Sequence, residues 1–196
     1  MMEITPPIKN LTAALEHLSH IQTDTPRYIE LTQSPNLFFL EALNRYSHET
    51  ALFRIGERWY AFTGMEDRFS PVWIPEIANA VIHCNGNYKG EKLSSPGDLA
   101  FCLEKAVNVI VHFEGITIFK PPKFKPILEQ PGRPDAGELE AASRVACLRR
   151  DDDMYIEFLK RAGVEWKIID GKDLTDERLR EILSSNNVIE INRNGH

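Results

Sequence analysis

The chain has 196 residues, of which 42% are hydrophobic and 27% charged, and its formal net charge is −6. This balance is typical of a globular protein and excludes collagen-like, low-complexity and wholly disordered chains. It also provides no general attraction to nucleic-acid phosphates or to anionic lipids.

Helix and strand signals alternate in the first third of the chain. The spacing of apolar residues predicts a helix over 11–18, and a short strand over 28–31. Ser34-Pro35 predicts the start of a second helix, because serine caps a helix and proline fits its first position. The apolar residues of that helix share one face, and they are Phe39, Leu40, Leu43 and Tyr46.

A tight hairpin is predicted next. Two apolar runs, Leu52 to Ile55 and Arg58 to Phe62, flank Gly56-Glu57, and a two-residue loop with glycine first favours a type II′ turn. Beyond Pro75 we expect a further helix, which carries the apolar residues Ile77, Ala78, Val81 and Ile82.

A helix and two β-branched runs occupy residues 95–119. Ser95-Pro96 predicts the start of the helix, and Val109 to Phe113 and Ile116 to Phe119 predict buried strands. The Glu114-Gly115 dipeptide between these runs forms either a second hairpin loop or a glycine bulge in one long strand. One buried group is expected to contain Leu99, Leu103, Val109, Val111 and Phe113.

Prolines divide the chain after residue 120. Five of the 12 prolines lie within 121–134, a density that precludes both helix and central strand. We therefore predict a main domain over 1–120, a connector over 121–134 and a subdomain over 135–196, although all three could form one compact domain. In the last part, helices over 138–148 and 154–162 precede a β-α-β unit, whose elements cover 164–169, 176–184 and 188–191. The predicted fold class is α+β, a mixed sheet with flanking helices and this C-terminal unit.

The cysteines indicate a reducing compartment. Cys84, Cys102 and Cys147 are odd in number and widely spaced, so we interpret them as small core residues rather than as disulfide partners. No secretory signal or membrane span is visible in the sequence, which predicts a cytoplasmic protein. The sequence contains no CxxC, HExxH, EF-hand or nucleotide-loop motif, so we predict no metal and no cofactor.

One pattern of letters matches a catalytic motif. Pro134-Asp135 followed by Glu165-Trp166-Lys167 has the form PD…ExK found in Mg²⁺-dependent nucleases. There, two carboxylates hold the metal and a lysine activates water, which would assign catalysis to Asp135, Glu165 and Lys167. The predicted helices between the two motifs argue against this alternative, because such enzymes place the motifs on neighbouring strands.

A small basic patch offers a second alternative. Lys120, Lys123, Phe124, Lys125 and Arg133 combine positive charge with one aromatic ring, as single-strand nucleic-acid sites do. Solvated linker side chains explain the patch better, since the chain as a whole is acidic.

The leading hypothesis is a non-catalytic protein-binding or regulatory protein, of inhibitor, immunity or adaptor type. Its partner would be another protein, and a homodimer is also possible. Tryptophan, tyrosine and arginine are the usual interface anchors. The expected binding residues lie in the first hairpin and the loop after it, with the Trp59 ring directed outward: Arg58, Trp59, Arg68, Phe69 and Trp73.

Overall fold

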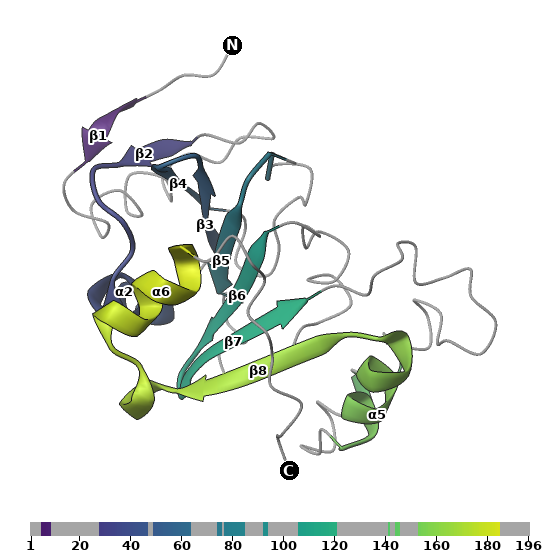
Figure 1. Cartoon of the computed structure of the whole chain (residues 1–196). Coiled ribbons are helices and arrows are strands. Elements are labelled where there is room, and N and C mark those ends of the chain that lie inside the picture. The colour runs from purple at the N-terminus through teal and green to yellow at the C-terminus, as the bar shows by residue number, and fades with distance from the viewer. Residues whose placement is uncertain are drawn as a thin grey trace.

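In the residues described below, a computed structural model of the chain (Figure 1) contains one mixed β-sheet and the helices α2, α5 and α6. It describes residues 5–8, 28–46, 49–63, 74–75, 77–84, 92–93, 106–120, 141, 144–145 and 153–184. The predicted helices over 11–18 and from Ser95, the connector over 121–134 and the last strand over 188–191 lie outside these ranges, as does most of the predicted helix over 138–148. So do Leu99, Leu103, Arg68, Phe69, Trp73 and Asp135.

The eight strands are arranged in the order β1-β2-β4-β3-β5-β6-β7-β8. The pairs β1–β2 and β5–β6 are parallel, and the other neighbouring strands are antiparallel. This mixed sheet with helices confirms the α+β class. The strands are β1 (Thr5–Ile8), β2 (Ile29–Leu31), β3 (Thr50–Ile55), β4 (Arg58–Thr63), β5 (Ala80–Cys84), β6 (Val107–His112), β7 (Gly115–Lys120) and β8 (Glu165–Asp170).

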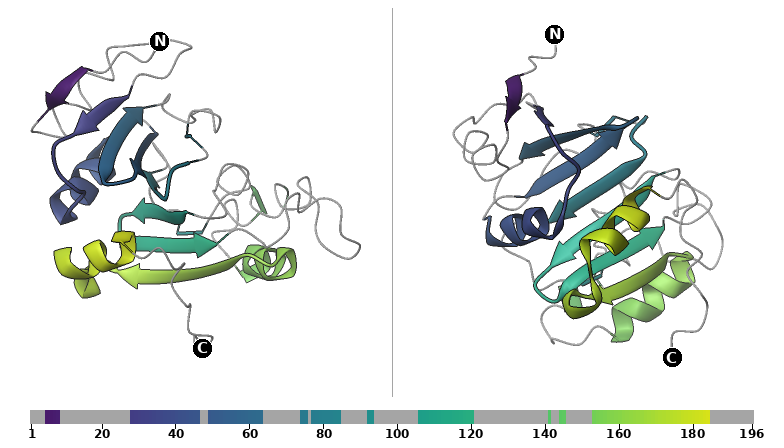
Figure 2. Two further views of the ribbon diagram at one scale, coloured as in Figure 1. Left: turned by 45° about the horizontal axis from the view of Figure 1, so that its top comes forward. Right: turned by 60° about the vertical axis from the view of Figure 1, so that its left-hand side comes forward.

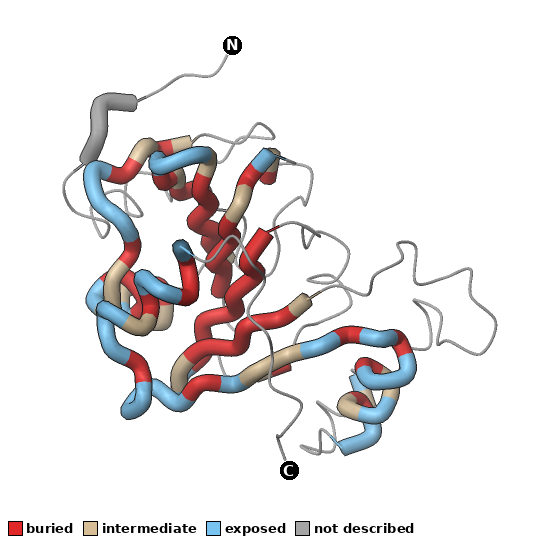
Figure 3. Tube along the Cα trace, in the orientation of Figure 1, coloured by how far each residue is buried: buried red, intermediate tan, exposed pale blue. Residues whose placement is uncertain are grey.

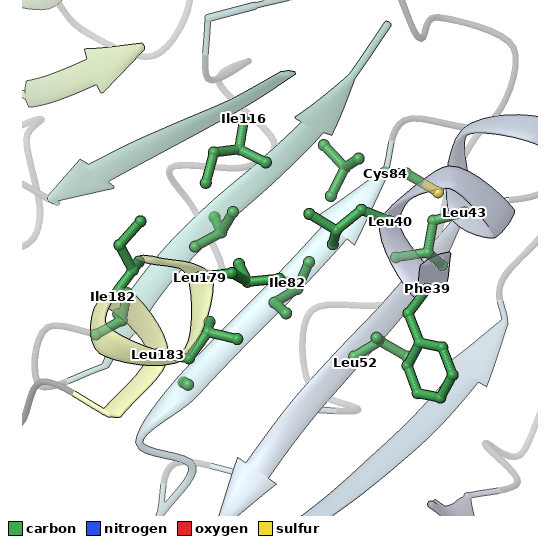
Figure 4. Close-up of a cluster of buried hydrophobic side chains, with 14 of the residues drawn as sticks. Phe39, Leu40, Leu43, Leu52, Ile82, Cys84, Ile116, Leu179, Ile182 and Leu183 are labelled. Atoms are coloured by element: carbon green, nitrogen blue, oxygen red, sulfur yellow. The ribbon is translucent and has the colours of Figure 1, made fainter. Parts of the chain in front are cut away.

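Two helices cover one face of the sheet. They are α2 (Leu37–Arg45) and α6 (Asp176–Ser184), and Figure 4 shows their apolar side chains above β3, β5, β6 and β7. Their N-termini are joined, because the carboxylate of Asp176 accepts a hydrogen bond of 2.8 Å from the backbone N–H of Leu37. Negative charge at a helix N-terminus is stabilising, so Asp176 favours both helices. The buried helix residues on this face are Phe39, Leu40, Leu43, Leu179, Ile182 and Leu183.

The opposite face is covered in part by α5 (Asp153–Ala162). The left view of Figure 2 shows α5 well apart from α2 and α6. Tyr155 and Leu159 of α5 pack against Ile110 and Phe119 of the sheet. A second cluster on this same face surrounds Phe53 of β3 and Phe62 of β4, farther from the β8 edge of the sheet. Because both faces are covered, the central strands are buried along almost their whole length (Figure 3), as β6 is.

Burial on both faces contradicts the outward orientation predicted for Trp59. Its side chain is 3% exposed and lies in the cluster beneath α2 and α6. Alternation along the strand places Tyr60 and Phe62 on the other face, where they contact Phe53. The prediction assumed a sheet with one wet face, whereas helices or loops cover both faces here.

The first hairpin, α5, β8 and α6 agree closely with the elements predicted from the sequence. Gly56 has φ 59°, which a two-residue loop with glycine first requires. Gly163 ends α5 at φ 79°, and the hydroxyl of Thr175 caps α6 by accepting a hydrogen bond from the Arg178 N–H. The whole of β8 pairs with β7, so residues 165–170 extend the sheet of the N-terminal part.

Two predicted helix features are wrong. Residues 80–84 form strand β5 instead of a helix after Pro75, because the β-branched Val81 and Ile82 pair with β3 and β6. The helix predicted to start at Ser34-Pro35 starts at Leu37, and the side chain of Asn36 is its cap.

Candidate functional site

One end of the sheet is defined by a register row that crosses six strands. The residues in this row are Thr63, Thr50, Cys84, Val111, Ile116 and Ile169. The carboxyl ends of the parallel strands β5 and β6 meet here, an arrangement at which open sheets often place their sites. The β6–β7 turn projects beyond this row.

The turn consists of Phe113 and Glu114, because His112 pairs directly with Gly115. Of the two arrangements considered from the sequence, the hairpin is therefore correct, but its loop begins one residue earlier than Glu114. The shift removes Phe113 from the strand, and its side chain is 71% exposed. The prediction that Phe113 is buried with Val109 and Val111 is wrong for this residue, while those two valines are buried.

A close backbone contact sets the position of the turn. Gly115 has φ 148°, and a Cβ atom at this position would collide with the backbone oxygen of Ile169 and lie 2.7 Å from the Gly171 nitrogen. Only glycine accepts such an approach. The turn therefore lies directly against the junction of β8 with the 3-10 helix η3 (Gly171–Asp173).

Three further contacts hold the turn in place. The Gly171 N–H donates to the Glu114 carbonyl at 2.7 Å, and the Asn44 side-chain amide of α2 donates to the His112 carbonyl at 3.0 Å. The Lys92 ammonium contacts the Glu114 carboxylate at 2.6 Å. The turn is thus tied to α2, to the end of β8 and to the segment around Lys92.

A buried histidine lies beneath the turn. His112 is 1% exposed, and its Nε2 atom is 3.3 Å from the hydroxyl of Thr117. That hydroxyl gives its single proton to the Lys92 carbonyl at 2.6 Å, so Nε2 must be the protonated nitrogen of the ring. The Nδ1 atom is buried and makes no hydrogen bond within the described residues.

The environment of His112 favours the neutral ring. Burial lowers the pKa of His112 below its usual value, and the positive charge of Lys92 lowers it further. The backbone of Ile116 and the carboxylate of Glu114 act on the pKa in the opposite direction. The charged form of the ring is therefore disfavoured beneath the turn.

The surface around the turn is charged with both signs. Asp170 and Lys172 form an ion pair of 3.3 Å at the end of β8, and the backbone N–H of Lys172 holds the pKa of the Asp170 carboxyl below its usual value. Glu114 and Lys92 form the second pair. The exposed ring of Phe113 is thus an apolar group with charged neighbours.

The residues predicted to bind a partner do not gather in one described place. Arg58 is exposed at the opposite end of the sheet, where its guanidinium lies 3.7 Å from the Glu30 carboxylate. Trp59 is buried, as described above, and the other three residues fall outside the described ranges. Phe113, which the sequence assigned to the core, is the exposed aromatic residue of the turn.

The nuclease hypothesis is untested. Glu165 and Lys167 share one face of β8, as their spacing predicted, and Glu165 is exposed. Within the described residues, no three His, Cys, Asp or Glu side chains lie close enough together to hold a metal ion. None of the described helices is sufficiently long and apolar to traverse a membrane.

Comparisons with known proteins identify no relative. No family model, curated protein or solved structure matches the chain.

The glycine at the turn provides a test of this geometry. We expect Gly115→Ala to lower the free energy of unfolding by about 3 kcal/mol or more, because backbone atoms must move to admit the Cβ. Gly56→Ala is the matched control, since Gly56 also has a positive φ but has open space around it. That variant should lose only about 1–2 kcal/mol in urea unfolding. Equal losses in the two variants would contradict the close contact at Gly115.

The pH dependence of stability tests the histidine. Because the pKa of His112 is lowered in the folded state, the unfolded chain binds more protons just below pH about 6.5. Stability should therefore fall as the pH drops through this range, by up to about 1.4 kcal/mol per pH unit from this residue. When the free energy of unfolding is measured in urea at several pH values, it should change less steeply with pH in His112→Gln than in the unaltered chain. An unchanged slope would show that the folded protein protonates His112 normally.

Proposed function

We propose that this chain is a non-catalytic cytoplasmic protein of inhibitor, immunity or adaptor type, and that it binds its protein partner through the β6–β7 turn. The observation that carries the proposal is the exposed ring of Phe113 on a turn held from three sides.

The exposure of Phe113 supports binding because a large apolar ring in water is unfavourable unless something covers it. Binding interfaces commonly depend on a few such residues, each inserted into a pocket of the partner. A single phenyl ring at the tip of a turn has the shape for this insertion.

The fixed position of the turn supports the proposal independently. A loop that orders only on binding loses conformational entropy, which weakens the complex. Here the carbonyls of His112 and Glu114 are already hydrogen-bonded to α2 and to η3. The turn would therefore lose little further conformational entropy when a partner binds.

The charged neighbours of the ring suit an interface rim. The Lys92–Glu114 and Asp170–Lys172 pairs place both signs of charge close to Phe113. Charges of this kind contribute more to specificity and to the rate of association than to affinity. The partner is therefore expected to offer an apolar pocket bordered by charged groups.

The test is capture of a partner by the purified, immobilised chain from a lysate of its native host, followed by mass spectrometry. Phe113→Ala should lose the partner, with an affinity lower by about 30-fold or more. Phe38→Ala is the matched control, because Phe38 is also an exposed phenylalanine, 61% exposed on α2. This control should retain the partner.

Two outcomes would contradict the proposal. One is recovery of the same partner by Phe113→Ala and by the unaltered chain in equal amounts. The other is a dimer of the purified chain, seen by light scattering, that Phe113→Ala abolishes, because the turn would then bind a second copy.

A further inference from the structure

A buried arginine lies at the end of the sheet opposite the turn. Arg54 of β3 is 8% exposed, and its neighbours in the register row are Trp59 of β4 and Ala80 of β5. The row belongs to the face covered by α2 and α6, since Trp59 and Ala80 are members of that core cluster. An arginine in such a row is unusual, because this residue type is rarely buried without a charged partner.

Among the described residues, Arg54 contacts neutral groups. Its Nε atom donates to the Oδ1 atom of Asn79 at 2.8 Å, and its guanidinium carbon lies 5.9 Å from the centre of the Trp59 ring. The backbone strengthens this arrangement, as the Asn79 N–H donates to the Arg54 carbonyl at 2.9 Å. Asn79 thus orients the guanidinium without neutralising it.

Within the described part of the chain, the Nη edge of the guanidinium has no hydrogen-bond partner. No carboxylate there pairs with Arg54, and its Nη1 and Nη2 atoms donate no hydrogen bond. The carboxylate of the nearby strand β2, Glu30, is on the opposite face by alternation and contacts Arg58 instead. Four N–H donors therefore remain on a fixed, positively charged fork.

Burial of most of this side chain has a physical consequence. A charge that loses much of its hydration and gains no opposite charge is destabilising, since the lost hydration is only partly compensated. The ring of Trp59 offsets only a small part of this cost. An anion at the fork would offset much more, because two parallel hydrogen bonds join a guanidinium to an oxyanion.

We propose that Arg54 and Asn79 form a binding site for one oxyanion, a carboxylate or a phosphate group, held by the free edge of the guanidinium. Because Asn79 accepts through Oδ1, its Nδ2 atom supplies two further donors at the same place. The site is independent of the proposed interface, from which it is separated by the length of the strands.

Thermal unfolding of the whole chain tests the site with inorganic phosphate and with acetate, each compared with chloride at equal ionic strength. A ligand that binds only the folded state raises the melting temperature. Above the dissociation constant, each tenfold increase in the concentration of free anion should raise the melting temperature by about 3–6 °C. A response to phosphate alone identifies a phosphate site, and a response to acetate identifies a carboxylate site.

Arg54→Met removes the charge at nearly constant length and should abolish the response. Arg58→Met is the matched control, since Arg58 is an exposed arginine on the neighbouring strand, and it should retain the response. Equal responses of all three proteins would overturn the proposal, as would the absence of any response beyond chloride in the unaltered chain.

A second measurement does not depend on the folding of Arg54→Met. In the unaltered chain, the hydrogen-bonded Nε–H of Arg54 should give a protected side-chain NMR signal, which Arg54→Lys assigns by its loss. This signal should shift and saturate during titration with the responding anion. A signal that stays constant at all concentrations would overturn the proposal.

Discussion

The contact between Gly115 and the backbone of Ile169 is the constraint on which the rest of this end of the molecule depends. It brings the first residue of β7 against the last residues of β8 so closely that no side chain fits between them. From this point the two strands stay in register over six residue pairs, from Gly115–Asp170 to Lys120–Glu165. Strand β8 thereby joins the sheet. Helix α6 follows β8 in the chain and packs on the face that α2 also covers.

The exposed ring and the buried histidine are two consequences of that constraint. With Gly115 paired to His112, the turn can contain only Phe113 and Glu114, so the phenyl ring lies outside the strand. The same pairing places His112 on the last position of β6, where the Thr117 hydroxyl and the Lys92 carbonyl complete a polar network beneath the turn. The proposed binding surface and the stability of the fold therefore both depend on one hairpin.

The α+β class, the first hairpin and the helices α5 and α6 could be predicted from the sequence, because these depend on local signals such as Gly56, Gly163 and Thr175. It could not place the second turn. Moving a two-residue loop by one position changes each cross-strand partner by two residues, which leaves every side chain on its original face. The hydrophobic pattern is equally satisfied by both positions, and the contact with Ile169 decides between them. The burial of Trp59 was missed for a similar reason, since coverage of a second face depends on distant helices and loops.

In the isolated chain, the β6–β7 turn is already held against the end of β8. Hydrogen exchange of the Gly171 amide tests this arrangement most directly, because this N–H donates to the Glu114 carbonyl across the contact. This amide should exchange far more slowly than in an unstructured chain, and Gly115→Ala should remove the protection. Exchange of the Gly171 amide at the unprotected rate in the unaltered chain would contradict it.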